Sequence, residues 1–168
     1  MTKYFINPAP STAEELKKRY RELTKIHHPD NGGDNDTMAK INNEYKELFP
    51  KLKDIHQNKE GETYTAKNPT SETPQDFIDL VNELMRMDNI VIEVIGCFVW
   101  VSGDTKPHKE TLKELKFKWH SKKICWYLSP EDYRPRSRKD YQMDEIRAMY
   151  GTSGEMNSHG TTKIHAMA

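Results

Sequence analysis

Two stretches near the start of the chain carry apolar residues spaced as on one face of a helix. In residues 11–28 a single helical stripe is formed by Leu16, Tyr20, Leu23 and His27. Ser11 and Glu14 fit a capping box at its start, and Pro29 ends it. From about residue 36 to 52 a second stripe is formed by Met38, Ile41, Tyr45 and Leu48. Two such helices joined by a short loop predict an antiparallel hairpin that buries one stripe against the other.

The pattern changes after residue 53. Residues 54–73 are polar and lack periodicity, which predicts a flexible linker. The elements expected after it are a helix that begins at Pro74, a strand over 90–101 that bends at Gly96, a helix over 107–115, a strand over 118–128 and a helix over 143–150. Residues 151–168 are expected to form a disordered tail. The predicted class is α+β, with an all-helical domain at 1–53 and a small α+β domain at 74–150.

Composition limits the classes of protein to consider. The chain has 168 residues, and its 26 basic and 26 acidic side chains give a net charge of zero, so charge points to a partner only locally. The longest apolar run, residues 90–101, is too short to cross a bilayer. No signal peptide is evident, and two cysteines make a poor disulfide framework. We therefore expect a cytoplasmic protein with no membrane partner.

The helical hairpin resembles a known family. The run from Leu16 to Leu23 leads to His28-Pro29-Asp30, and the run from Met38 to Leu48 contains Ile-Asn-x-x-Tyr-x-x-Leu. Together these are similar to the J domain of DnaJ-type co-chaperones over roughly the first fifty residues. The resemblance implies that the triplet docks on a DnaK-type chaperone and favours ATP hydrolysis, while the J domain does no chemistry itself.

A basic ridge is expected beside the triplet. Lys17, Arg21 and Lys25 recur every four residues and lie opposite the apolar stripe. Such a ridge suits an acidic groove on a partner, with Tyr20 as a further supporting contact. Glu22 weakens the ridge, because many relatives carry a basic residue at that position. The competing interpretation is a plain hairpin whose turn contains His-Pro-Asp by chance, with a solvated charged face, since proline and aspartate are ordinary turn residues.

The second predicted domain carries a different signal. Residues 106–139 contain 11 basic and 4 acidic side chains, a net charge of +7, and aromatic residues lie among them. This mixture is typical of single-stranded nucleic-acid binding, for which the candidate residues are Lys118, Lys122, Lys123 and Trp126. The segment is also weakly similar to small strand–helix–strand modules of phage and plasmid proteins. The alternatives are that Trp119 and Trp126 fill a small core, or that the domain binds an unfolded client or a specific protein.

Metal binding and catalysis find little support. Four potential zinc ligands, Cys97, His108, His120 and Cys125, lack the closely spaced pairs typical of zinc sites. Neither a phosphate-binding glycine loop nor a nucleophile signature is recognisable. We expect no metal, no cofactor and no enzymatic activity. The first hypothesis is a co-chaperone, and the alternative is a nucleic-acid-binding protein of a phage or mobile element.

Overall fold

The computed structural model describes residues 4–58, 60–96, 98–130 and 139–150, together with the backbone of 155–157 and 162–163. The chain divides into two compact units, Met1–Arg86 and Met87–Ala168, and each is described by itself. The chain contains helices and antiparallel sheets, so its class is α+β.

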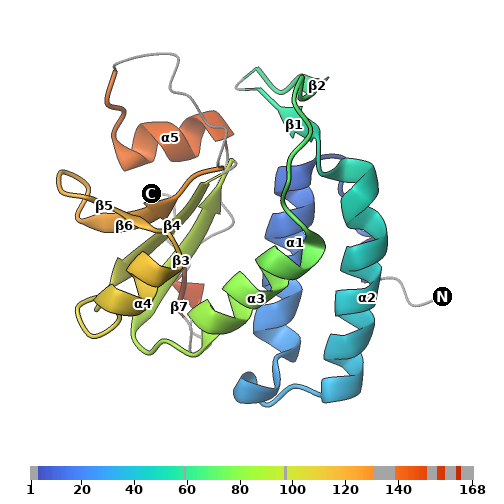
Figure 1. Ribbon diagram of the computed structural model, residues 1–168, viewed down its shortest axis with the longest axis horizontal. Helices are drawn as coiled ribbons and strands as arrows, with labels where there is room; N and C mark the ends of the chain where they lie inside the picture. Colours follow the sequence, from blue (N-terminus) through green and yellow to red (C-terminus); the bar gives the residue numbers. More distant parts are fainter. Residues whose placement is uncertain are drawn as a thin grey trace. The chain divides into compact units, whose positions relative to one another are not determined.

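The first unit is built around a helical hairpin (Figure 1). Its elements are α1 (Ala13–His27), the 3₁₀ turn η1 (Pro29–Asn31), α2 (Asn35–Leu52), β1 (Ile55–Gln57), β2 (Thr63–Thr65) and α3 (Pro74–Met85). The N-cap of α1 is Thr12, whose side chain accepts a hydrogen bond from the backbone N–H of Glu15. Ser11 donates its N–H and its hydroxyl to the Glu15 carboxylate. The predicted capping box of Ser11 and Glu14 is therefore wrong by one residue.

The core of the first unit is aromatic. Tyr20 of α1 and Tyr45 of α2 have ring centroids 4.5 Å apart, and Phe77 of α3 lies 6.0 Å from each. All three side chains are almost fully buried. Thr73 and Asp76 form a capping box at the start of α3, and Pro74 occupies its first turn. The helix predicted to open the second domain is thus the third helix of the first unit, and the boundary falls after Arg86.

The segment expected to be a flexible linker is also structured. Strands β1 and β2 pair antiparallel, with Ile55 opposite Thr65. The Asp54 carboxylate accepts a hydrogen bond from the N–H of Thr70, which fixes the chain that follows. Nδ1 of His56 lies 2.5 Å from Oε1 of Glu14, so β1 is held against α1. The prediction failed because each strand has only three residues, which is too short to show a period in the sequence.

The second unit is a sheet with two covering helices. Its elements are β3 (Ile90–Ile95), β4 (Phe98–Gly103), α4 (Lys109–Glu114), β5 (Lys118–His120), β6 (Cys125–Leu128), α5 (Met143–Tyr150), β7 (Glu155–Asn157) and β8 (Thr162–Lys163). The strand order is β5-β6-β4-β3-β7-β8, and every neighbouring pair is antiparallel. β4 and β5 are therefore parallel, and the chain passes through α4 between them.

Two single strands predicted from the sequence are hairpins. The run 90–101 turns back at Gly96, whose φ of 56° lies in the left-handed region that suits glycine. The run 118–128 turns back over residues 121–124, where Ile124 has a φ of 52°. The expected disordered tail is also corrected in part. β7 pairs with β3 and β8 pairs with β7, and the other residues of 151–168 lie outside the described part of the chain.

Side chains of the second unit pack on both faces of its sheet. On one face, Ile95, Trp100 and Cys125 are buried, and Met143 and Ile146 of α5 pack against them. Glu93 lies on the same face as Trp100, because the two are direct cross-strand partners. It is 4% exposed and forms an ion pair with Arg147 of α5 through two contacts, of 2.7 and 2.9 Å. Val101 and its cross-strand partner Trp126 occupy the opposite face.

Candidate partner-binding site

The His-Pro-Asp triplet forms a tight turn at one end of the helical hairpin. The N–H of His28 closes the last turn of α1 by donating to the carbonyl of Thr24 at 2.8 Å. Pro29 has no N–H to continue the helix, and the chain enters the 3₁₀ turn η1. The triplet therefore stands between the end of α1 and the start of α2, as the sequence predicts.

Within the turn, His28 and Asp30 contact each other. Nδ1 of His28 accepts a hydrogen bond from the backbone N–H of Asp30 at 3.2 Å, and it lies 3.6 Å from Oδ2 of the same residue. Because Nδ1 is the acceptor, a neutral ring carries its proton on Nε2. The His28 side chain is 13% exposed, whereas the Asp30 side chain is 57% exposed. The imidazole is thus held in place, and the carboxylate projects into solvent.

Several further contacts hold the turn in one conformation. The side-chain amide of Asn31 donates to the carbonyl of Lys25 at 2.9 Å, and the N–H of Gly33 donates to the carbonyl of His28 at 3.0 Å. A Cβ on Gly33 would overlap the backbone carbonyl of His27, so only glycine fits there. These contacts present His28, Pro29 and Asp30 with little conformational entropy left to lose on binding.

The next helix begins immediately after the turn. The carboxylate of Asp34 accepts hydrogen bonds from the N–H and the hydroxyl of Thr37, at 2.9 and 3.0 Å. These bonds lower the pKa of Asp34, because they stabilise its charged form. The cap therefore fixes the point at which the chain leaves the turn.

The predicted basic ridge of Lys17, Arg21 and Lys25 is not an exposed surface. Nζ of Lys17 lies 2.6 Å from the Glu72 carboxylate and 5.0 Å from the centre of the Phe77 ring. Arg21 is 3% exposed. Lys25 is partly buried, and its pKa is lowered first by burial and then by the neighbouring charge of Arg21. α3 and the segment before it cover this face of α1, which the sequence pattern does not reveal.

Tyr20 is likewise a core residue. Its side chain is fully buried, and its hydroxyl donates to Oδ1 of Asn42 at 2.8 Å. Burial raises the pKa of Tyr20 to about 12. In this structure Tyr20 joins α1 to α2 and offers no surface to a partner.

One exposed residue beside the turn was missed by the sequence analysis. Ile26, in the last turn of α1, is 65% exposed. It lies off the apolar stripe, two residues before His28. The signal that could have revealed it is an isoleucine at a position where the helical period predicts a polar residue.

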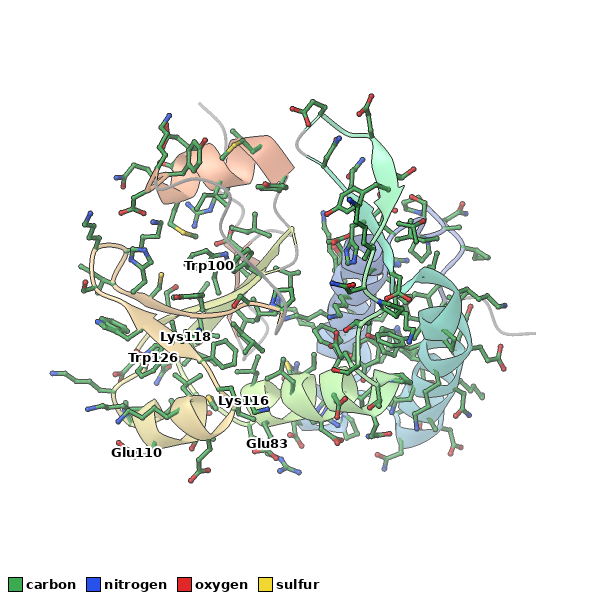
Figure 2. All side chains as sticks on the ribbon, turned by 45° about the horizontal axis from the view of Figure 1, so that its top comes forward. Glu83, Trp100, Glu110, Lys116, Lys118 and Trp126 are labelled. Atoms are coloured by element: carbon green, nitrogen blue, oxygen red, sulfur yellow. The ribbon has the colours of Figure 1, made fainter. Side chains whose placement is uncertain are left out.

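The four candidate nucleic-acid-binding residues are not gathered on one exposed surface. Trp126 is 6% exposed and packs edge-to-face against Trp119, with centroids 5.5 Å apart. The Lys123 side chain is 5% exposed, with Nζ 2.5 Å from Asp140. Lys118 is exposed on β5 (Figure 2), and Lys122 is exposed with Nζ 3.3 Å from Asp140. Buried Trp126 offers no face for stacking, so its predicted role is corrected to a core role.

In the described part of the chain, no three His, Cys, Asp or Glu side chains are arranged to hold a metal ion. Cys97 lies outside it, and Cys125 is buried, which raises the pKa of its thiol. No described helix is both long enough and apolar enough to span a bilayer.

Comparison with protein-family models, curated proteins and solved structures finds no match for this chain. Function is therefore inferred from the residues and contacts given above.

Proposed function

We propose that this protein is a DnaJ-like co-chaperone. Its His28-Pro29-Asp30 turn would dock on a DnaK-type ATPase and stimulate ATP hydrolysis, and the second unit would supply targeting or client binding in the cytoplasm. The observation that carries the proposal is the fixed geometry of the triplet. His28 is locked by a hydrogen bond to the N–H of Asp30, and the Asp30 carboxylate is presented to solvent.

The geometry favours recognition over chemistry. A catalytic acid–base pair needs a reacting group within hydrogen-bond reach in a water-excluding site. Asp30 is instead 57% exposed, and Nδ1 of His28 is occupied by a backbone N–H. A rigid turn with one projecting carboxylate suits docking, because the ordering cost is paid on folding. The proposal therefore assigns no enzymatic step to this protein.

The proposal is tested by the binding of a bacterial DnaK, loaded with ATP, to the immobilised full chain. His28→Gln and Asp30→Asn are each expected to weaken binding strongly. Matched controls come from the second unit, where His108→Gln and Asp104→Asn make the same chemical changes and should leave binding unaltered. Equal binding by the unaltered protein and by both triplet variants would contradict the proposal.

A second candidate function is nucleic-acid binding by the second unit. It is favoured by one observation, namely that the Trp119 side chain is 47% exposed on β5. An exposed indole can stack on a base of single-stranded nucleic acid. A salt-dependent affinity of the full chain for a single-stranded oligonucleotide, reduced by Trp119→Ala, would support this function. Affinity that is unchanged in Trp119→Ala would argue against it.

A further inference from the structure

The surface around the turn differs from the one expected. Lys17 already has an anionic partner in Glu72 and an aromatic partner in Phe77, and Arg21 is 3% exposed. To use Lys17, a partner would first have to displace Glu72 and Phe77, and therefore α3 and the chain before it. The cost of that displacement decides whether the basic ridge can serve as the docking surface.

Displacing α3 would expose a large apolar surface. Phe77 is 2% exposed, and Val81 and Leu84 are each 1% exposed. Burial on this scale is a main source of a small unit's stability, so α3 is a constituent of the fold and not a loosely attached cover.

The surface that remains exposed lies at the end of the helical hairpin, beside the His28-Pro29-Asp30 turn. Ile26 is the most exposed large hydrophobic side chain among the described residues of the first unit, at 65%. Pro29 and Asp30 follow it by three and four residues, and both are exposed. We call these three residues the tip surface. A single exposed isoleucine is common on proteins, but this one adjoins a turn whose conformation is fixed by its own hydrogen bonds.

We propose that Ile26 is the apolar anchor through which the tip surface binds the DnaK-type chaperone, in place of the basic ridge. This inference rests on the proposed function and names the contact that determines affinity. Because α1 and η1 are held rigidly, the isoleucine is positioned before the partner arrives, and burying it loses little rotamer entropy.

The partner surface that fits is an apolar depression bordered by a basic side chain. Ile26 and Pro29 supply the apolar contact. The charged residues that come next in the chain and are exposed are Asp30, Asp34 and Asp36, all acidic, and exposed Lys40 follows one helical turn further on. Lys25 is partly buried and is the only ridge residue within one turn of the tip. Charge complementarity therefore favours a cation on the partner, opposite to the acidic groove expected from the sequence.

The test is the single-turnover rate of ATP hydrolysis by a bacterial DnaK as a function of the concentration of full-length protein. Ile26→Ser is expected to raise the half-maximal concentration about tenfold, which corresponds to about 1.4 kcal/mol. Ile6→Ser is the matched control, because Ile6 is also a half-exposed isoleucine of the first unit, at 51%. Lys17→Met keeps an unbranched chain over Phe77 and removes the charge, and it should change the half-maximal concentration less than about twofold.

If the unaltered protein stimulates hydrolysis and Ile26→Ser matches it, the anchor is refuted while the proposed function stands. If Lys17→Met is as defective as His28→Gln, with the circular dichroism of both unchanged, the basic ridge is the docking surface and the inference is overturned. If the unaltered protein stimulates none of several DnaK-type chaperones, the proposed function itself fails.

Discussion

Replacing Phe77 with alanine tests whether α3 belongs to the first unit. The Phe77 side chain is 2% exposed, and its ring centre lies 6.0 Å from those of Tyr20 and Tyr45. Truncating a buried phenylalanine costs about 3–5 kcal/mol, since apolar contacts are lost and a cavity remains. A small unit has a total stability of about 5–15 kcal/mol, so the variant should lose a large share of it.

The assay uses the distribution of tryptophans. Trp100, Trp119 and Trp126 all lie in the second unit, so tryptophan fluorescence reports its unfolding. Far-ultraviolet circular dichroism reports mainly the first unit, which contains the longest helices. With a urea m-value of about 1–2 kcal/mol/M, a loss of about 3 kcal/mol lowers the circular-dichroism midpoint by about 1.5–3 M. The fluorescence midpoint should stay where it is.

A milder substitution keeps the test usable. If Phe77→Ala does not fold, Phe77→Leu retains most of the side-chain volume and should cost about 1–1.5 kcal/mol. The reasoning is refuted if either variant moves the fluorescence transition and leaves the circular-dichroism transition unchanged. That result would assign α3 to the second domain, where the sequence pattern alone had placed it.

Three further predictions concern the His56–Glu14 pair of the first unit, the Glu93–Arg147 pair of the second unit, and Gly33 in the turn. The hydrogen bond that the His56 ring donates to the Glu14 carboxylate raises the pKa of His56. The stability that this pair contributes is therefore full below about 6.5, the ordinary pKa of histidine, and is lost as pH rises through the folded-state pKa. Urea midpoints measured at several pH values should show this loss, and His56→Gln should abolish it. Arg147→Met removes the ion pair with the buried Glu93 carboxylate and should cost about 3–5 kcal/mol by tryptophan fluorescence, whereas an unchanged midpoint would show that the pair is dispensable. Gly33→Ala should distort the turn and weaken DnaK binding as strongly as His28→Gln, and normal binding would show that the turn geometry is not required.

Much of the local structure could be predicted from the sequence. Helices at 13–27, 35–52 and 143–150 match their apolar periodicity closely, because periodicity and capping act over neighbouring residues. The pairing of the strands was harder to predict from the sequence than the helices. The runs 90–101 and 118–128 each read as one continuous strand, and a single left-handed residue, Gly96 or Ile124, turns each of them into a hairpin. The sequence does not indicate a turn at Ile124, since β-branched residues rarely adopt positive φ.

The candidate site was predictable in part. The position of His28-Pro29-Asp30 at the end of the hairpin follows from the two flanking helices. The contacts of Lys17 with Glu72 and Phe77 do not, because they depend on the chain returning to α1 after more than fifty residues. An apolar stripe on α3 shows that the helix is buried somewhere but not against which element. Long-range packing of this kind cannot be predicted from the local patterns of a single sequence.

The decisive measurement for the proposed function is the single-turnover rate of ATP hydrolysis by a bacterial DnaK, with and without saturating full-length protein. The unaltered protein should accelerate hydrolysis, and His28→Gln at the same concentration should not. Acceleration by both proteins, or by neither across several DnaK-type chaperones, would contradict the assignment of the His28-Pro29-Asp30 turn as the docking site.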